Sequence, residues 1–269
     1  MLKYSLKLIL PNFIIKIINQ FFKRDIKFVG NYSNWKEASD NSLGYNSDKI
    51  FSKSRKSFLK VISKEAKYER DSVLFYSEKI NYPLINIFNK IQRKKRSCLN
   101  ILDFGGSFGS TYFQNYSVLK NKNKFNWSIV EQEKIVKYVK KFKLEDNLSF
   151  YPSIKNYMAK CKPDIVLFSA VIQYLEYPNK IINYLLKKKI RNIFFLNTPF
   201  TNNKELIKIQ IVPKHIYDAN YPIRIFNERY FLKFFKDNNY KIISYFIPNE
   251  KIGDIVFKNF LFRLNNYNN

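Results

Sequence analysis

The sequence predicts an α/β protein built on a mostly parallel sheet, and three observations support this fold class. Short apolar runs rich in branched and aromatic residues recur from residue 99 to residue 264. Segments of helical length separate most of these runs, and the first run ends in a glycine-rich turn. Alternating strands and helices form βαβ units, in which the strands lie parallel and helices cover both faces of the sheet.

Seven of the apolar runs are expected to be strands. The first five are separated by segments long enough to form a crossover helix, so we expect them to be parallel. The last two are joined only by the short PNEKIGD turn and are expected to form an antiparallel hairpin. The seven strands fall in residues 99–103, 125–130, 148–154, 163–169, 191–200, 240–248 and 255–264.

The turn after the first strand has the spacing Asp-x-Gly-x-Ser-x-Gly, from Asp103 to Gly109. Its glycines allow the backbone to turn tightly and to approach a ligand closely. The spacing does not fit the dinucleotide fingerprint, and an acid directly before the glycines would repel a pyrophosphate. The same acid suits a ligand that carries positive charge, such as the ammonium and sulfonium of S-adenosylmethionine. Ser107 and Ser110 are expected to cap the following helix, and a purely structural turn is the alternative interpretation.

An acidic residue also ends the second predicted strand. Glu131 follows the run FNWSIV, about 20 residues beyond the last glycine of the turn. A carboxylate at this place can accept two hydrogen bonds from a ribose diol. Glu133 is a rival two residues further on, but Glu131 stands where the apolar run stops.

The glycine turn, Glu131 and the segment DIVLFSAVIQYLEYP together resemble the class I S-adenosylmethionine-dependent methyltransferases. Further motifs, from about Phe28 to the C-terminus, are similar to an uncharacterised bacterial family of methyltransferase-like proteins associated with surface-polysaccharide biosynthesis. These motifs are GNYSNWKEA, GY at 44–45, RD at 70–71, LDFGGSFGSTYF, WSIVEQ, VLFSAVIQYLEYP, NTPF and VPKHIYDANYP.

The resemblance implies a Rossmann-like, seven-stranded sheet that binds S-adenosylmethionine. In that family the glycine turn holds the methionine end of the cofactor, and the acid after the second strand holds the ribose. Arg70 suits the methionine carboxylate because a guanidinium matches a carboxylate in shape and charge; an ordinary salt bridge of Arg70 with Asp71 or with a neighbouring helix is the alternative. The residues assigned to the cofactor are Arg70, Asp103, Gly105, Gly106, Ser107, Gly109, Glu131 and Ser169.

The methyl acceptor is expected at the ends of the fourth and fifth strands and under an inserted lid. The lid is expected at about residues 200–226, where a proline- and tyrosine-rich segment interrupts the pattern. It contains His215, the only histidine, whose imidazole has a pKa suited to a general base; polar surface is the alternative role. The residues assigned to the substrate are Gln173, Tyr174, Thr198, Tyr217 and Tyr221.

Two regions precede the first strand of this domain, which is expected to span residues 96–269. Residues 1–27 are expected to form an amphipathic basic helix that begins near Pro11 and is too short and too polar to span a bilayer. Its first 26 residues would lie in the headgroup layer of a membrane, or they would pack on the core of the protein. Residues 28–95 are expected to form a helical cap, with helix throughout 51–80.

Charge and composition limit the choice of partners. The net charge of +27 comes from 48 Lys and Arg against 21 Asp and Glu, spread along the whole chain. Such basicity attracts RNA or an anionic membrane, but no RNA-recognition motif accompanies it, so no specific nucleic acid is expected. Two cysteines and one histidine predict neither a disulfide framework nor a metal site, and favour the cytoplasm.

The sequence therefore predicts a cytoplasmic methyltransferase, peripheral on the inner membrane face, that methylates a hydroxyl of a sugar or a lipid-linked glycan. The acceptor follows from the family resemblance and not from individual residues. An RNA methyltransferase and a non-enzymatic, cofactor-binding partner subunit are the alternatives.

Overall fold

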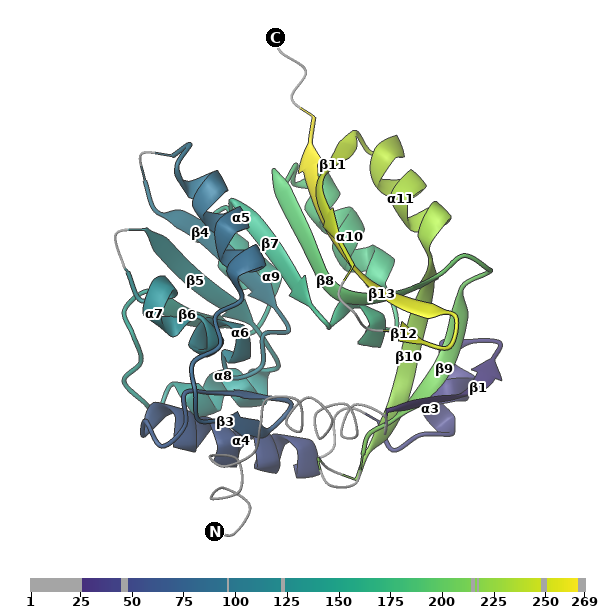
Figure 1. The fold of residues 1–269 in the computed structure, drawn as a ribbon, viewed down its shortest axis with the longest axis horizontal. Helices are drawn as coiled ribbons and strands as arrows, with labels where there is room; N and C mark the ends of the chain where they lie inside the picture. Colours follow the sequence, from purple (N-terminus) through teal and green to yellow (C-terminus); the bar gives the residue numbers. More distant parts are fainter. Residues whose placement is uncertain are drawn as a thin grey trace, which may run out of the picture.

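The computed structural model describes residues 26–44, 48–95, 97–121, 124–213, 216, 218–247 and 251–265. These residues fold around one large sheet with helices on both faces (Figure 1). The central strands, in spatial order, are β6 (Leu148–Tyr151), β5 (Phe125–Val130), β4 (Leu99–Phe104), β7 (Ile165–Ser169), β8 (Asn192–Thr201), β13 (Ile255–Leu264) and β11 (Tyr240–Phe246).

This order confirms the predicted Rossmann-like sheet. The first five strands along the chain, β4, β5, β6, β7 and β8, run parallel to their neighbours. The last two strands form the expected antiparallel pair, and β13 lies antiparallel between β8 and β11. Most predicted bounds agree closely with the observed strands because each strand is a short apolar run flanked by polar residues. The strand expected over 148–154 was predicted too long, since β6 ends at Tyr151 and Ser153 caps the next helix.

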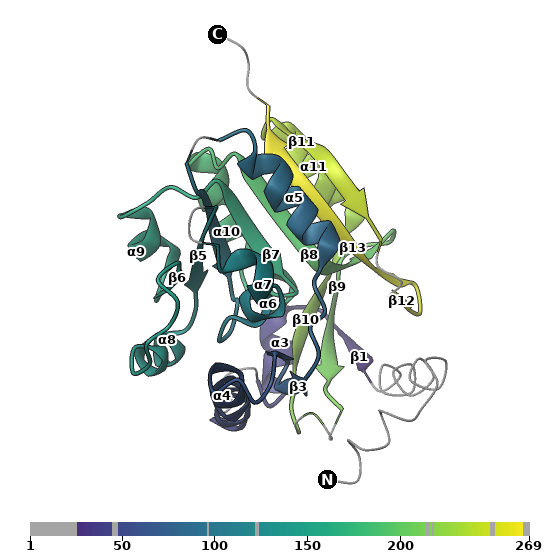
Figure 2. The same cartoon turned by 60° about the vertical axis from the view of Figure 1, so that its left-hand side comes forward.

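The sheet is buried on both faces because its strands alternate apolar side chains between two cores. Leu102, Val166 and Phe195 face one core, whereas the adjacent residues Ile101 and Leu167 face the other. The first core is covered by α9 (Ile154–Met158), α10 (Pro178–Lys187) and α11 (Glu228–Asp237). The second is covered by α5 (Tyr82–Gln92), α6 (Ser110–Gln114) and α7 (Tyr116–Leu119) (Figure 2).

The connections leave the sheet toward opposite faces on either side of β4 and β7. The chain after β4 enters α6 and α7 on one face, and the chain after β7 enters α10 on the other. In an open α/β sheet this change of direction opens a crevice at the carboxyl ends of the two strands, where ligands bind.

The expected lid at about 200–226 is largely sheet. β8 continues to Thr201, and β9 (Leu206–Ile211) and β10 (Asn220–Asn227) form an antiparallel pair that β1 (Lys27–Tyr32) extends. β10 joins β8 through two parallel residue pairs, so eleven strands of the described chain share one sheet. Sequence analysis did not recognise the runs LIKIQI and YPIRIF as strands, although their branched residues favour a pleated surface; the role of this segment as a lid stays a prediction.

The expected helical cap over 28–95 is only partly helical. α3 (Trp35–Asp40) and α4 (Asp48–Ile62) are helices, but the expected helix over 51–80 ends at Ile62. β2 (Tyr68–Arg70) and β3 (Val73–Phe75) then form a hairpin. The stacked rings of Tyr68 and Phe75, 4.5 Å apart, stabilise this pair across the strands.

The expected amphipathic helix over 1–27 lies almost entirely outside the described residues, as does Tyr45 of the GY motif. Within the described part of the chain, no helix combines the length and apolar character needed to cross a membrane.

Candidate active site

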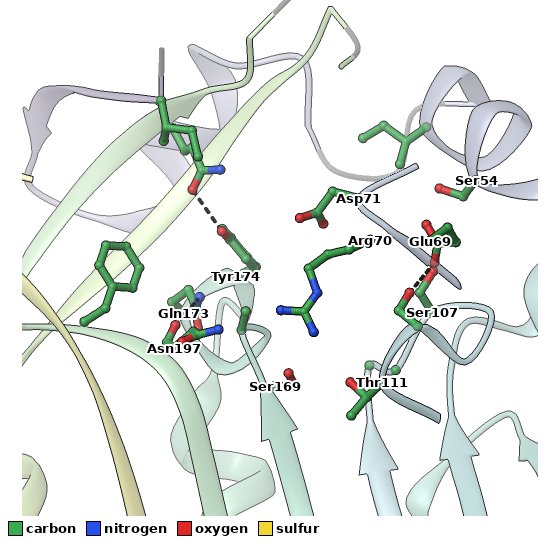
Figure 3. Close-up of a pocket in the computed structure, with 18 of the residues that line it drawn as sticks. Ser54, Glu69, Arg70, Asp71, Ser107, Thr111, Ser169, Gln173, Tyr174 and Asn197 are labelled. Atoms are coloured by element: carbon green, nitrogen blue, oxygen red, sulfur yellow. Dashed lines mark hydrogen bonds between the residues drawn. The ribbon is translucent and has the colours of Figure 1, made fainter. Parts of the chain in front are cut away.

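A cavity of about 380 Å³ opens at the carboxyl ends of β4, β7 and β8, where the topology predicts a crevice. One wall is made by the glycine turn and the β2–β3 hairpin, and the opposite wall by the ends of β7 and β8 with β1, β9 and β12 (Lys251–Ile252) (Figure 3). Four lining residues have positive φ without being glycine: Asp71, Ser107, Ala170 and Asn197. Strained backbone of this kind concentrates at functional sites.

Two glycines of the turn are required by their surroundings. Gly105 has φ +69°, and a Cβ atom on it would lie 2.3 Å from Cγ2 of Val171. A Cβ atom on Gly106 would lie 2.5 Å from Oδ2 of Asp103. Both glycines line the cavity, so the backbone forms its wall and the Asp103 carboxylate lies directly behind that wall.

Asp103 is a buried carboxylate without a partner. Its side chain is completely buried, and neither of its oxygens has a hydrogen-bond partner. Burial, together with the nearby carboxylate of Glu131, raises the pKa of Asp103 to about 7. Because an unpaired buried carboxylate is costly, the arrangement suits a cationic donor that reaches Asp103 at the glycine turn.

Glu131 connects the end of β5 to the glycine turn. Its Oε1 accepts a hydrogen bond from the Ser107 N–H at 3.1 Å, and its Oε2 accepts one from the Gln132 N–H at 2.7 Å. Burial raises the pKa of Glu131 above its ordinary value. Glu133 is exposed and pairs with Lys137 at 2.8 Å, so of the two predicted candidates only Glu131 lies at the turn.

The expected helix caps are not formed. Gly109, with φ +98°, is the N-cap of α6, and no side chain caps that helix. Ser107 has φ +52° and donates its backbone N–H to Glu131. The Ser110 hydroxyl donates instead to Glu69 of the β2–β3 hairpin. The prediction failed because the partner of Ser110 is 41 residues away in the chain, beyond the reach of a local capping rule.

Arg70 extends from β2 into the cavity (Figure 3). Its Nη2 donates to Oε1 of Gln114 at 2.5 Å, and Gln114 is itself fixed because its Nε2 donates to the Lys79 carbonyl at 2.9 Å. Within the described chain Arg70 has no carboxylate within ion-pair distance, so the alternative of a salt bridge with Asp71 is not realised. The guanidinium keeps donors available for a ligand.

Glu69 fastens the hairpin to its neighbours. Its Oε2 accepts the Ser72 N–H at 2.9 Å, and its Oε1 accepts the Ser110 hydroxyl. Ser57 of α4 donates to the Ser72 carbonyl at 2.8 Å. Burial raises the pKa of Glu69 to about 7. This network holds the hairpin turn against both α4 and the glycine turn.

The predicted substrate residues divide into two groups. Gln173 and Tyr174, in the 3-10 turn η2 (Ile172–Tyr174), line the cavity, as does Ser169. Nε2 of Gln173 donates to the Asn197 carbonyl at 3.3 Å, whereas its buried Oε1 has no partner. Thr198 and Tyr221 are buried and do not line the cavity.

Tyr221 lies behind the wall and is linked to it. The Tyr174 hydroxyl donates to Oε1 of Gln210 at 2.9 Å, and Nε2 of Gln210 donates to the Tyr221 hydroxyl at 3.4 Å. His215 and Tyr217 lie outside the described residues, so their predicted roles stay predictions.

Sequence analysis missed several residues of the acceptor-side wall. They come from strands far apart in the chain and carry no local motif. Phe28 of β1 and Phe257 of β13 lie with their ring centroids 6.4 Å apart, and Lys251 and Gln210 are close by in the lining. In the described part of the chain no group of His, Cys, Asp and Glu side chains is arranged to hold a metal ion.

Comparison with known proteins gives matches among solved structures only. No family model matches this chain, and no curated protein matches it. Among solved structures, the N-terminal domain of EvdMO1, determined in the presence of SAH and D-fucose, matches with a TM-score of 0.51 and 10% identity, covering 78% of this chain and 97% of that one.

A second solved structure is 1,6-didemethyltoxoflavin-N1-methyltransferase from Burkholderia thailandensis, with bound 1,6-didemethyltoxoflavin and S-adenosylhomocysteine. It matches with a TM-score of 0.44 and 10% identity, covering 67% of this chain and 77% of that one. At 10% identity, the similarity to the EvdMO1 domain establishes the fold alone, which is a Rossmann-like α/β fold.

Proposed function

We propose that this protein is an S-adenosylmethionine-dependent methyltransferase. The observation that carries the proposal is the pair of unpartnered oxygens on Asp103, directly behind a wall that only glycine can form. A buried carboxylate in this position matches the ammonium of the methionine moiety. S-adenosylmethionine would supply an electrophilic methyl group bound to its sulfonium.

Three further side chains fit the remaining parts of that molecule. Arg70, fixed by Gln114, would bind the methionine carboxylate with donors that Gln114 leaves unused. Glu131, at the end of β5, would accept hydrogen bonds from the ribose diol, since each carboxylate oxygen can accept a second bond. Ser169 borders the space between these groups and the acceptor side.

The volume of the cavity agrees with a small ligand. Pockets for small molecules and cofactors measure roughly 300–1,000 Å³, and this one measures about 380 Å³. The EvdMO1 domain, whose structure was determined with SAH and D-fucose, has the same fold. This likeness is consistent with a nucleoside cofactor and a sugar-sized acceptor in the present chain.

The proposed acceptor is a hydroxyl on a sugar or glycan intermediate. The acceptor-side wall offers amide groups from Gln173, Asn197 and Gln210, and aromatic rings from Phe28 and Tyr174. Amides and flat rings suit a polar acceptor that carries hydroxyl groups, because they offer hydrogen bonds and apolar surface. Lys251 adds a cation to this wall.

A deletion strain tests the proposal. We expect mass spectrometry of surface glycans from cells that lack the gene to show losses of about 14 Da, the mass of one methylene that replaces a hydrogen when a hydroxyl is methylated. Complementation with the intact gene should restore these masses, and complementation with an Asp103→Asn variant should not. Unchanged glycans would contradict the proposed acceptor class.

An RNA acceptor is favoured by one observation, the net charge of +27. If the charge has no specific role, unrelated RNAs should bind weakly, without sequence preference, and should be released steeply as salt rises. A selective complex that resists salt would favour the RNA alternative.

The proposed membrane contact rests on residues 1–26, which lie almost entirely outside the described chain. Deleting them should release the protein from anionic vesicles and leave cofactor affinity intact. A truncated protein that loses stability or aggregates would indicate that these residues complete the core instead.

A further inference from the structure

The cavity is lined by two carboxylates, and only one of them is available to a ligand. Both oxygens of Glu69 are occupied by Ser72 and Ser110. Asp71 also lines the cavity, its side chain is exposed, and within the described chain it makes no hydrogen bond or ion pair. Asp103 and Glu131 are near the cofactor side but are not part of the lining.

The backbone of the hairpin turn directs Asp71 into the cavity. Asp71 and Ser72 have φ values of +49° and +65°, the left-handed conformation of both central residues in a two-residue hairpin turn. Ser57 and Glu69 hold that turn through the carbonyl and the N–H of Ser72. In Figure 3 the Asp71 carboxylate lies beside Arg70, on the side nearer to Tyr174.

Asp71 therefore lies where the cofactor side of the cavity meets the acceptor side. Its neighbour in the chain, Arg70, extends toward Ser169 and Thr111 at the ends of the parallel strands. A turn that presents a guanidinium and a free carboxylate at adjacent positions can serve both reactants at once.

We propose that Asp71 is the general base of methyl transfer and that the acceptor group is a hydrogen-bond donor, a hydroxyl in the proposed function. The acceptor oxygen forms a bond to the methyl carbon while the bond from that carbon to sulfur breaks. The electron pair of the broken bond stays on sulfur, which becomes a neutral thioether. The hydroxyl proton passes to the Asp71 carboxylate and leaves to solvent from this exposed side chain.

The charges around Asp71 are consistent with this role. Desolvation of the carboxyl group raises the pKa of Asp71, and the positive charge of Arg70 acts in the opposite direction. Glu69 is on the same hairpin, Tyr174 faces Asp71 from η2, and Lys251 lines the cavity from β12. A carboxylate whose pKa lies above its ordinary value is a better proton acceptor than a free one.

This inference rests on the proposed function, and one set of variants separates the two. Asp71→Asn keeps the shape of the side chain and tolerates positive φ as well as aspartate does, so the turn is preserved. Asp71→Glu keeps a carboxylate but displaces it. Asp40→Asn is the matched control, because Asp40 is an exposed residue of α3 whose carboxylate pairs with Lys36 at 2.9 Å.

Each full-length variant is incubated with methyl-labelled S-adenosylmethionine and with aqueous and lipid extracts of the deletion strain, in which the acceptor lacks its methyl group. Label entering any fraction is measured, and cofactor affinity is measured separately by calorimetry. We expect Asp71→Asn to reduce transfer by about 100- to 10,000-fold without changing cofactor affinity, and Asp71→Glu to retain part of the activity. Asp40→Asn should match the wild type.

The pH dependence provides a second readout at saturating cofactor. Transfer by the wild type should fall as the pH drops through the pKa of Asp71, because a protonated carboxyl cannot accept the proton. That decrease should be absent in Asp71→Asn. If Asp71→Asn transfers label at the wild-type rate, the assignment of Asp71 is wrong while the methyltransferase function stands. A wild-type protein that labels no fraction contradicts the proposed function and, with it, the role of Asp71.

Discussion

The two sides of the cavity are built on different principles. The cofactor side consists of the glycine turn, the end of β5 and the β2–β3 hairpin, and it contains one buried carboxylate, Asp103, whose oxygens have no hydrogen-bond partner in the described chain. The acceptor side consists of strand ends from β1, β8, β9 and β12. Its polar groups are mainly amides and a phenol, and several of them already bond to one another.

This difference indicates which properties of its ligand each side of the cavity determines. An unpartnered buried carboxylate requires a cation at one place, so the cofactor side defines the charge and the position of what it binds. The amides of Gln173 and Gln210 bond to a backbone carbonyl and to tyrosine hydroxyls, and they can rearrange toward many hydroxyl patterns. The acceptor side therefore defines mainly the shape of its ligand. Substitutions on the cofactor side should therefore have the larger effects.

The largest effect is expected from Gly105→Ala. The added Cβ would lie 2.3 Å from the side chain of Val171, and the backbone has φ +69°. We expect cofactor affinity to fall by more than about 100-fold, since the turn must move to relieve the contact. Gly44→Ala is the matched control, because Gly44 has φ +79° but no atom within 4 Å of the added carbon. Calorimetry should show normal cofactor affinity for this control, with a stability loss of about 1–2 kcal/mol.

Asp103→Asn should have the next largest effect on binding. Replacing the carboxylate removes a charge-assisted hydrogen bond worth about 1.5–3 kcal/mol, which corresponds to roughly 10- to 150-fold weaker binding of S-adenosylmethionine. Calorimetric titration measures the affinity directly. An unchanged affinity would show that Asp103 does not bind the cofactor.

The same substitution should stabilise the protein without ligand, in a pH-dependent way. The pKa of Asp103 is raised in the folded state, so its protonated form is favoured by folding, and that contribution is lost as the pH rises through about 7. At pH 8 the wild type bears a buried, ionised carboxylate and Asp103→Asn does not. Thermal melts should show the variant more stable at pH 8, by about 4 kcal/mol at most, and nearly equal to the wild type near pH 4. Equal stability at both values would contradict the burial of an unpaired charge.

Glu131→Gln should weaken cofactor binding by a smaller amount, about tenfold. The remaining amide oxygen can still accept one of the two N–H bonds, from Ser107 or from Gln132. The NH₂ group that replaces the other oxygen can only donate, so it loses the second N–H bond and cannot accept from a ribose hydroxyl. Glu133→Gln is the matched control, because Glu133 is exposed and pairs only with Lys137 on its own helix. If both variants bind equally, the assignment of the ribose to Glu131 is wrong.

The smallest effect is expected on the acceptor side. Gln173→Leu removes the unpartnered buried Oε1 and the hydrogen bond to the Asn197 carbonyl. We expect KM for the acceptor to rise by a few-fold to about tenfold, since a neutral hydrogen bond contributes about 0.5–1.5 kcal/mol, and cofactor affinity to stay the same. A large loss of cofactor affinity would show that Gln173 belongs to the cofactor side of the cavity and not to the acceptor side.

The same contrast explains what could be predicted from the sequence. The glycine turn and Glu131 are local signals, in which a strand, an acid and glycines follow each other within a few residues. The sequence could therefore predict that both lie at the same end of the sheet, where Glu131 accepts the Ser107 N–H. The serine caps failed because the partner of Ser110 is Glu69, on a hairpin that was itself predicted to be helical. Gln210 and Phe28 reach the cavity through the pairing of β1 with β9, two segments distant in the chain, which no local pattern encodes.

Thr198 and Tyr221 show the limit of prediction by motif. Both were assigned to the substrate from their positions after strands or in an expected lid. The pleat of β8 turns Thr198 into the interior, and the pairing of β9 with β10 places Tyr221 behind Gln210. The sequence indicates which segments approach the site but not which face of each strand lines it.

The measurement that tests the central claim most directly is calorimetric titration of the full-length protein with S-adenosylmethionine, S-adenosylhomocysteine and NAD. We predict that the first two bind with one site per chain, because each brings an ammonium to Asp103 and a ribose to Glu131. NAD should not bind, since its pyrophosphate would lie against the buried carboxylate of Asp103. Binding of NAD, with no binding of either sulfur nucleoside, would contradict the account of this cavity.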